Sequence, residues 1–525
     1  MKILYYNWVQ FDDPEKRGGG VSVYLRNLIG QLVKQKLDVY FLCSGLSYNF
    51  FKNDTYIRRT KNIFGNNCRT FEIVNSRVMS PGHFSFHTIK DAIENREMTE
   101  VFYEFLKENG PFDVIHFHNL EGIPLSFLKL TEEFSSTKVY LTLHNYFPFC
   151  PQVNLWRREK QNCRNYLDGA RCVNCLTYEP PYQAAIRAHQ LAFMLKSLGF
   201  GPGTWFFNFV FRHVTRLKRG YRWIYSKTHP LATVNNLPDH NKKLVIEGLK
   251  STKVYAERRR FYVSVLNEYC HRIIAVSQRT AALAKGFNVQ GSKLSVLYIG
   301  TEQAEHIKLK REPPEKGEVI SFLYMGYMRR DKGFYFLLEV LESLPRESAS
   351  KMRIVIAAPI TDDNVVQRLK GIALKYHEII VYDGYTHNNL PGILQGVHVG
   401  IIPVLWEDNL PQVAVEMVSN GIPIITSDLG GSAELSQCKK FVFKAGSKVR
   451  IKQVINGIVD DPSSLKSYWD ETLTLRTMSM HIDELFKLYR AGGTKTSEAA
   501  DSDNRLCENK YPFNVSLSIR RGAGK

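Results

Sequence analysis

Residues 400–435 read GIIPVLWEDNLPQVAVEMVSNGIPIITSDLGGSAEL. This order predicts a strand, a short acidic loop, a helix, a second strand, and a Gly-Gly turn that enters another helix. The same alternation runs through both halves of the chain, and strands that alternate with helices predict parallel, doubly wound sheets of the α/β class. Ligands of such sheets bind at the carboxyl ends of the strands, so we expect a site near the acidic loop and the Gly-Gly turn.

Two acids mark the helix of this stretch. Asp408 and Glu416 have seven residues between them, and the helix is led in by Asn409, Leu410 and Pro411. Proline suits a first helical turn because its missing N–H would have no partner there. Free amides at a helix start can bind phosphate oxygens. Glu416 follows about one and a half turns later, where its carboxylate can accept hydrogen bonds from ribose hydroxyls.

The Gly-Gly turn offers a second set of amides. Gly430 and Gly431 follow directly on a predicted strand, so their amides can approach an anion closely. Two anion pockets beside a carboxylate describe a nucleotide-diphosphate site better than a metal site. The only Asp-x-Asp motif, at 501–503, falls in the C-terminal tail. The sequence therefore predicts a nucleotide-diphosphate site that works without a catalytic metal ion.

This stretch resembles the donor-binding segment of the family 4 retaining glycosyltransferases (glycosyl transferases group 1), of the bacterial polysaccharide-biosynthesis type. The family signature is two glutamates with seven residues between them. Asp408 stands at the first position here, and Glu407 lies one residue out of register. The resemblance implies a GT-B fold, in which two doubly wound domains face each other across a cleft. It also implies that the first acid lies beside the donor sugar and that Glu416 binds the ribose. Whether Asp408 or Glu407 fills the first position stays open.

Other positions in the second half fit the same family pattern. Gly326 ends a predicted strand, and Lys332 opens the next helix, where it can stabilise the charge that develops on a departing diphosphate. The family usually has an arginine directly after the glycine. Tyr327 replaces it here, and Arg330 lies close enough in the chain to compensate.

The resemblance implies three further contacts. Gly384 and Tyr385, at the end of another predicted strand, match the segment whose backbone contacts the nucleobase. Gly19 and Gly20 follow the first strand, in a loop that the family places near the donor phosphate and the acceptor. His144 matches the histidine that contacts the donor sugar from the N-terminal domain. Two more strand-end histidines, at 116 and 118, receive no role.

The length and the pattern of elements predict two domains and an insertion. Residues 1–305 are expected to form an N-terminal, acceptor-side domain with an insertion at 150–270, and residues 306–476 a C-terminal donor-binding domain. Residues 477–491 are predicted to form a last helix that packs back on the N-terminal domain. Residues 492–525 are polar and lack apolar periodicity, so we expect a mobile tail.

Four cysteines in the insertion have the spacing C-x12-C-x8-C-x2-C, namely Cys150, Cys163, Cys172 and Cys175. Four thiolates complete a tetrahedral structural zinc site, and basic neighbours favour the thiolate form. Because only one C-x-x-C is present, separate buried thiols are the alternative. Disulfides are the least favoured, since the N-terminus reads as a core strand and not as an export signal. A site closed by four cysteines has no open position, so no cofactor is expected for catalysis.

The formal net charge of +19 bears on partners, not on the fold. Between Arg157 and Lys227 there are thirteen Lys and Arg but three acids, interleaved with the aromatic run at 205–211. This combination suits an interfacial membrane element, although aromatics that pack on their own domain fit equally well. No apolar run reaches the roughly 18–20 residues that span a bilayer. We expect a cytoplasmic protein, with peripheral contact to an anionic membrane as a further expectation.

Together with these patterns, the resemblance implies a hexosyltransferase that moves a sugar from a nucleotide-diphosphate sugar to a hydroxyl of a glycan or lipid-linked acceptor, in cell-surface polysaccharide synthesis. One alternative is a non-catalytic nucleotide-sugar-binding or regulatory protein on the same fold. Asp408 and Tyr327 favour it, whereas Glu416 and Lys332 oppose it. A nucleic-acid-binding zinc protein is the other alternative, suggested by the charge and the cysteines. No nucleic-acid partner is expected on the favoured interpretation.

Overall fold

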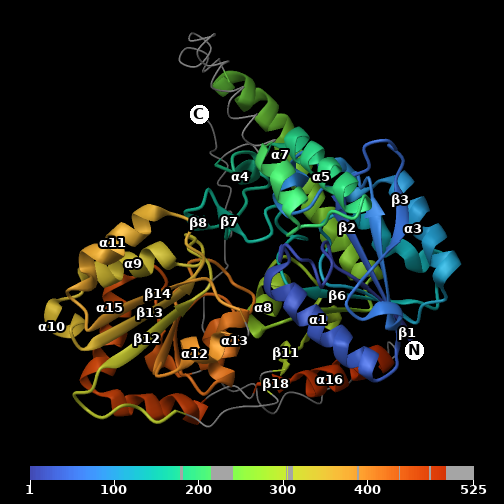
Figure 1. Cartoon of the computed structure of the whole chain (residues 1–525). Coiled ribbons are helices and arrows are strands. Elements are labelled where there is room, and N and C mark those ends of the chain that lie inside the picture. The colour runs from blue at the N-terminus through green and yellow to red at the C-terminus, as the bar shows by residue number, and fades with distance from the viewer. Residues whose placement is uncertain are drawn as a thin grey trace, which may run out of the picture.

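The structure is a computed structural model that describes residues 1–177, 181–213, 240–302, 304, 311–386, 389–436, 438–471 and 475–491. An eight-stranded sheet with the order β10-β9-β6-β5-β1-β2-β4-β3 forms the centre of the N-terminal domain (Figure 1). Its strands are β1 (Lys2–Tyr6), β2 (Asp38–Ser47), β3 (Tyr56–Thr60), β4 (Cys68–Val74), β5 (Val114–Phe117), β6 (Lys138–Leu143), β9 (Arg272–Ala275) and β10 (Leu294–Val296). Neighbouring strands run parallel except for β3, which is antiparallel to β4.

Helices lie on both faces of this sheet, as expected for a doubly wound domain (Figure 1). In α1 (Gly19–Lys34) the buried residues Leu25, Leu28 and Leu32 recur at helical spacing, which places one apolar stripe against the sheet. The other helices are α2 (Ile89–Ile93), α3 (Arg96–Asn109), α4 (Ala170–Val173), α5 (Tyr182–Ser197), α7 (His240–Tyr269) and α8 (Gln278–Gly286). A small hairpin of β7 (Trp156–Arg157) and β8 (Gln161–Asn162) belongs to the insertion.

The C-terminal domain is built on a six-stranded parallel sheet with the order β14-β13-β12-β15-β16-β17. Its strands are β12 (Ile320–Met325), β13 (Met352–Ala358), β14 (Glu378–Asp383), β15 (Val399–Ile402), β16 (Ile424–Ser427) and β17 (Val442–Phe443). Its helices are α9 (Phe334–Ser343), α10 (Arg346–Ala349), α11 (Asp363–Ala373), α12 (Leu390–Leu394), α13 (Gln412–Ser419), α14 (Ser432–Ser436) and α15 (Lys448–Asp460). The predicted fold class, two doubly wound α/β domains, is therefore confirmed.

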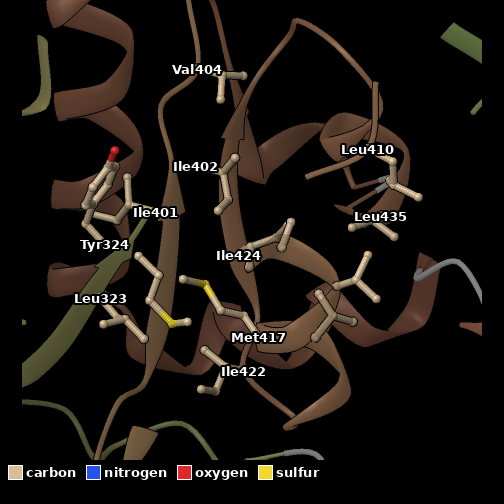
Figure 2. Packing of buried hydrophobic residues seen from close by; sticks show 14 of the residues in the cluster. Leu323, Tyr324, Ile401, Ile402, Val404, Leu410, Met417, Ile422, Ile424 and Leu435 are labelled. Carbon is tan, nitrogen blue, oxygen red and sulfur yellow. The ribbon is translucent and has the colours of Figure 1, made fainter. Parts of the chain in front are cut away.

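The unit β15–α13–β16 carries the stretch that was most informative in the sequence. Met417 of α13 packs among Ile401, Ile424 and their neighbours (Figure 2). Gly400 makes room for it, because a Cβ there would lie 2.2 Å from the Met417 sulfur. Leu410 is also buried in this core. Buried side chains thus hold both ends of the acidic loop between β15 and α13 in place.

The end of the described chain returns to the N-terminal domain. The short strand β18 (Arg476–Thr477) pairs with β11 (Gly300–Thr301), and α16 (Met478–Arg490) then lies along the N-terminal domain beside α1 (Figure 1). His481 and Tyr489 of α16 are both buried there. The tail at 492–525 lies outside the described residues, as do residues 303 and 305–310 between the two domains.

Candidate active site

The acidic loop brings a buried carboxylate against the predicted phosphate-binding lysine. Asp408 is only 6% exposed, and its Oδ2 accepts a hydrogen bond from Lys332 Nζ at 2.6 Å. The same ammonium group lies 5.0 Å from the ring centre of Trp406. Gly333 holds the lysine turn close to the loop, since a Cβ there would lie 1.7 Å from the Pro403 carbonyl oxygen. Two segments that are distant in the sequence therefore meet in one ion pair.

Glu407 points elsewhere and joins the two domains. Its carboxylate accepts two hydrogen bonds from Arg279 of α8, at 2.9 Å from Nε and 2.5 Å from Nη2. It also accepts the Gly430 N–H at 3.2 Å. Asp408 is thus the acid that faces Lys332, whereas Glu407 is engaged by the N-terminal domain. Sequence reasoning missed Arg279, because no local pattern marks a partner more than a hundred residues away.

The Gly-Gly turn fastens the acidic loop. While the Gly430 N–H donates to Glu407, the Gly431 N–H donates to the Asp408 carbonyl at 2.8 Å. The prediction that these two amides are free to bind phosphate is wrong in this structure, since both already have protein acceptors. Their role here is to fix the backbone that carries Asp408.

Gly430→Ala is expected to destabilise the protein far more than a glycine substitution with the same backbone geometry elsewhere. Gly430 has φ +71°, and a Cβ there would lie 2.1 Å from the Asp408 carbonyl oxygen. Gly446 has φ +74° but no atom within 4 Å of a Cβ, so it isolates the backbone cost of about 1 kcal/mol. Overlap in packed surroundings adds about 1–3 kcal/mol. Equal losses of unfolding free energy in urea for the two variants would contradict this account of Gly430.

Glu416 lies deep in the C-terminal domain. It is 3% exposed, and the Tyr385 hydroxyl donates to its Oε2 at 3.3 Å. Burial raises the pKa of Glu416 to about 7. Gly384, which precedes Tyr385, has φ +78°, a backbone conformation that favours glycine. Pro411 occupies the N-cap position of α13, one residue earlier than predicted, so Glu416 lies about one turn into the helix.

Gly19 and Gly20, which were predicted to lie in a loop, begin α1 instead, and this helix start faces the start of α13. A Cβ on Gly20 would lie 3.3 Å from the Gln412 Cβ, whereas around Gly19 no atom lies within 4 Å. Asn409 also spans the boundary, because its Nδ2 donates to the Leu143 carbonyl at 3.2 Å. Asn409, at the predicted phosphate-binding helix start, therefore links the two domains through its side chain.

Several buried polar atoms around the acidic loop have no hydrogen-bond partner within the described part of the chain. They are Trp406 Nε1, Asn409 Oδ1 and Gln412 Oε1. Buried polar atoms are nearly always paired, so each unpaired one calls for an explanation. One donor and two acceptors along a single loop suit a ligand rich in hydroxyl and phosphate groups.

His144 is partly buried and lies beside the buried His116 and His118 at the strand ends of the N-terminal sheet. Its Nε2 lies 3.0 Å from His118 Nδ1, and burial lowers the pKa of His144 to about 3. It is therefore neutral at physiological pH. His116 is held by Tyr489 Oη at 2.6 Å and by Thr142 Oγ1 at 2.7 Å, which gives it a structural role. The Leu143 carbonyl accepts a hydrogen bond from Asn409, so the residue before His144 contacts the acidic loop.

Arg330 does not contact the Lys332–Asp408 ion pair. It is exposed, with its guanidinium 5.7 Å from the ring centre of Tyr335. Gly326 follows β12 directly, with φ +141°, and its N–H donates to the Ala357 carbonyl at 3.1 Å. The structure therefore does not show the predicted compensation for the missing arginine at Tyr327.

The four cysteines of the insertion are buried and free of disulfides. Burial raises the pKa of Cys172 to about 12 and also raises the pKa of Cys163. The negative charge of the neighbouring Cys150 thiolate acts in the same direction. The expectation that basic neighbours favour thiolates is wrong for the metal-free chain. Among the described residues, which include all four cysteines, no group of three or more His, Cys, Asp or Glu side chains is arranged to hold a metal ion. Structural zinc stays a prediction.

Metal analysis decides the question of zinc. Protein purified under reducing conditions is expected to carry about one equivalent of zinc if the four-thiolate prediction holds. Cys172→Ser should then release the metal and lower the stability of the insertion, because zinc binding is coupled to folding. Cys270→Ser, which changes a buried cysteine outside the group, is the control. Protein that contains no zinc would leave four buried thiols.

Comparison with known families gives a match in the C-terminal domain. Residues 305–472 match the family model of glycosyl transferases group 1. This domain contains Lys332, Asp408 and Glu416. An uncharacterized 41.2 kDa protein in the cps region of Klebsiella pneumoniae is 27% identical over 192 residues, which cover 35% of this chain and 49% of that protein. The chain therefore spans about half the length of the curated relative that it matches.

Solved structures show that the likeness in fold extends beyond the group 1 glycosyltransferase domain. A sucrose-phosphate synthase from Thermosynechococcus elongatus has a TM-score of 0.52 at 14% identity, covering 93% of this chain and 98% of that one. HepE from Anabaena, in complex with UDP, has a TM-score of 0.52 at 10% identity and covers 93% and 99%. A trehalose 6-phosphate synthase from Burkholderia multivorans has a TM-score of 0.51 at 12% identity and covers 93% and 98%. The chain has the GT-B fold.

Proposed function

We propose that this protein is a retaining glycosyltransferase that moves a hexose from a nucleotide-diphosphate sugar to a hydroxyl of a glycan or lipid-linked acceptor. The observation that carries the proposal is the Lys332–Asp408 ion pair, placed in a group 1 glycosyltransferase domain at the boundary with the N-terminal domain. A cation held by a single buried acid is ready to change partners when a diphosphate arrives, because charge-assisted hydrogen bonds to phosphate are strong.

Each group at the site has a role in this proposal. Lys332 neutralises the departing diphosphate, and Asp408 then lies free beside the donor sugar. Glu416 accepts hydrogen bonds from the ribose, with the backbone at Gly384 and Tyr385 against the base. His144 is neutral, so it can exchange a hydrogen bond with a sugar hydroxyl without adding charge.

The reaction proposed needs no protein nucleophile. The acceptor hydroxyl attacks the anomeric carbon from the face that the diphosphate leaves. A new glycosidic C–O bond forms as the bond to the phosphate oxygen breaks, and the hydroxyl proton passes to the leaving phosphate. No metal ion or cofactor is assigned to these steps.

Nucleotide binding is the direct test of the function. UDP, GDP, ADP and their glucose and mannose derivatives are compared in a thermal-shift panel, because a ligand of the native state must stabilise it, by about 2.7 kcal/mol at a hundred times its Kd. UDP is the first candidate, since HepE was solved with UDP. Stabilisation by one diphosphate series together with donor-sugar turnover supports the proposal. Stabilisation without turnover would indicate the non-catalytic alternative, and no stabilisation by any nucleotide would refute both.

We also propose that the protein acts on surface polysaccharide at a cytoplasmic membrane face. The relative in a cps region supports the pathway. The aromatic run of the insertion supports the membrane contact, because Trp205 is 75% exposed and Phe206 and Phe209 are exposed beside it. Phe207 is buried, so the run packs on its own domain only in part. No helix in the described part of the chain is long and apolar enough to cross a membrane.

Vesicle binding tests the membrane contact. The protein is expected to sediment with vesicles of anionic lipid at low salt and to be released in part by high salt, since screening acts over about 8–10 Å. Trp205→Ala with Phe206→Ala should remove the fraction that salt does not release. Leu374→Ala, at a 93% exposed position of the C-terminal domain, is the matched control. A failure to sediment at low salt would refute the membrane contact and leave the transferase proposal standing.

A further inference from the structure

A second cavity lies in the N-terminal domain beside the start of α1. It has a volume of about 510 Å³ and is walled by the loop at 8–17, the end of β2, and the edge strands β3 and β4. Lys196 and Pro202 of the insertion close one side. The loop at 8–17 leads directly into Gly18–Gly20, and Gly20 faces Gln412 of the donor-binding domain. The cavity therefore opens next to the candidate active site but on the acceptor side of it.

The lining of this cavity suits a sugar. Trp8 offers a half-buried aromatic ring, a surface on which the apolar face of a pyranose can pack. Beside it, Arg17 Nη2 and Asp13 Oδ1 form an ion pair of 2.7 Å. Paired, planar donors and acceptors of this kind match the hydroxyl groups of a carbohydrate.

The cations that line the same cavity outnumber its acids, with five Lys and Arg side chains against Asp12, Asp13 and Glu72. Arg59 bonds to the side-chain oxygen of Asn66, an uncharged amide, at 3.0 Å. Lys196 has a long ion pair of 3.6 Å with Glu15. In the described residues, no carboxylate lies within ion-pair distance of Arg59 or Lys61. Arg59 and Lys61, which have no acidic partner among the described residues, favour an anionic group on the ligand, and the long ion pair leaves Lys196 able to assist them.

An apolar surface borders the cavity. Leu198 and Phe200 lie in the chain between Lys196 and Pro202, which line the cavity, and Leu198 is 65% exposed. Phe200 packs against Phe206 in a tilted arrangement, with ring centres 4.6 Å apart. We call the exposed residues of this turn and the next helix the apolar rim; they are Leu198, Phe200, Trp205, Phe206 and Phe209.

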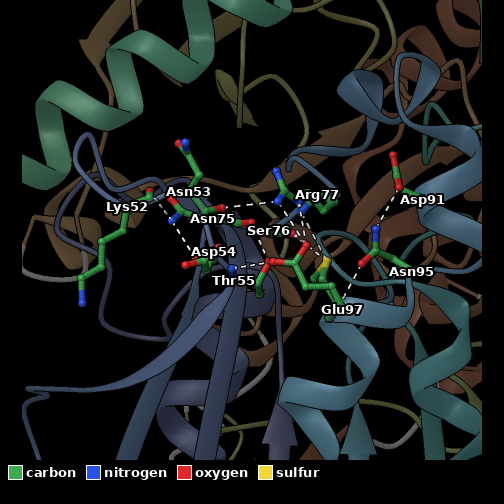
Figure 3. Close-up of polar contacts among 11 residues, drawn as sticks. Lys52, Asn53, Asp54, Thr55, Asn75, Ser76, Arg77, Asp91, Asn95 and Glu97 are labelled. Carbon is green, nitrogen blue, oxygen red and sulfur yellow. Dashed lines mark hydrogen bonds and ion pairs between the residues drawn. The ribbon is translucent and has the colours of Figure 1, made fainter.

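The polar wall opposite the rim is fixed in position. Asn75 donates through Nδ2 to the carbonyls of Lys52 and Asp54, at 2.8 and 2.9 Å. The Thr55 N–H donates to Glu97 at 2.8 Å, and these contacts anchor the loop that leads into β3 (Figure 3). Because β3 carries Arg58 and Arg59, two of the cavity's cations start from an anchored strand. A fixed site loses little entropy when a ligand binds.

We propose that this cavity binds the headgroup of an amphipathic acceptor, a sugar joined through a phosphate group to a long apolar chain, and that the chain lies along the apolar rim. The three features of the site correspond to the three parts of such a molecule. Trp8 and the Asp13–Arg17 pair contact the sugar, Arg59, Lys61 and Lys196 contact the phosphate, and the rim covers the chain. This inference rests on the proposed function, because it assigns the acceptor of that reaction.

Binding of soluble probes to the full-length protein tests the assignment by calorimetry. The probes are decyl glucosyl phosphate, methyl glucosyl phosphate and decyl glucoside, each below its micellar concentration. The wild type is expected to bind the first about tenfold tighter than either of the others. Arg59→Gln with Lys196→Gln should weaken the two phosphate probes about tenfold and leave decyl glucoside unchanged. Phe200→Ser with Trp205→Ser should weaken only the two decyl probes.

Matched controls remove equivalent groups elsewhere. Lys439→Gln with Lys440→Gln changes two exposed cations of the C-terminal domain, and Leu374→Ser changes an exposed apolar residue there; all probes should bind these as they bind the wild type. Equal affinity of the wild type for the three probes, or equal losses in test and control variants, would overturn the proposal. The nucleotide panel is run on the same variants. Probe binding without nucleotide binding would refute the transferase and keep the cavity assignment, and the reverse would refute the cavity alone.

Discussion

Lys332→Ala is expected to lower the rate of sugar transfer by about a hundredfold to a thousandfold, the loss found when one preorganised donor to a developing negative charge is removed. The measurement is kcat at saturating donor. Lys448→Ala is the control, because Lys448 of α15 forms an ion pair of 2.7 Å with Glu339 of α9 in the same domain. Unchanged turnover in a folded Lys332→Ala protein would exclude the lysine from the reaction.

The structure adds a cost in stability that the sequence did not suggest. An exposed cleft lysine should be dispensable for folding, but Lys332 is the partner of a buried carboxylate. Its removal leaves Asp408 unpaired, at a cost on the order of 1–3 kcal/mol. Lys332→Ala with Asp408→Asn should regain much of that stability in urea unfolding without regaining turnover. Such a separation would distinguish a chemical role from a structural one.

Glu416→Gln is expected to weaken nucleotide binding about tenfold to a hundredfold at pH 8, since hydrogen bonds to a charged group contribute about 1.5–3 kcal/mol. The pKa of Glu416 is about 7 in the folded protein, so the ribose meets the ionised acceptor only above that pH. Nucleotide affinity of the wild type should therefore rise as the pH increases through about 7, and affinity of the variant should stay flat. Calorimetric titrations between pH 5.5 and 8.5 measure both.

The same carboxyl group makes stability depend on pH, in the opposite sense to a salt-bridged acid. Its pKa is raised from 4.5 to about 7 on folding, so its favourable contribution is full below 4.5 and is lost as the pH rises to about 7. Glu416→Gln should remove this loss. Glu121 is the matched control, because burial also raises its pKa to about 7 while its oxygens contact Gly82 and Asn145. Glu121→Gln should change the pH dependence of stability but not that of nucleotide affinity; a change in both would contradict the ribose assignment.

The strands at the centre of each sheet could be predicted because they are buried on both faces. β1, β5, β6 and β12 read as short apolar runs that end in a polar residue. The pair β3–β4 was missed for the corresponding reason: β3 reads YIRRT and is only partly buried, so no apolar run marks it. Edge strands depend on pairing with a neighbour, and one sequence does not show that pairing.

The site could be predicted only where one residue carries the signal. Lys332, Asp408 and Glu416 stand at spacings that a local pattern defines, and the first two are found in contact. The partners that organise them are distant in the chain. Arg279 engages Glu407, and the Gly431 amide is taken by the Asp408 carbonyl. Whether an amide is free is a property of the folded surroundings and has no sequence signature.

Because α16 packs on the N-terminal domain, the part of the chain that is synthesised last completes the domain that is synthesised first. Tyr140 donates to the Leu488 carbonyl at 2.9 Å, and Lys138 Nζ to the Tyr489 carbonyl at 2.9 Å. Domains usually fold one after another as the ribosome releases them, at about 5–20 residues per second. Here the first domain keeps its α16-binding face uncovered while the whole donor-binding domain is translated. For that interval the nascent chain exposes the apolar face that α16 later covers. A chain that ends before Met478 lacks this helix, so its N-terminal domain keeps that face exposed.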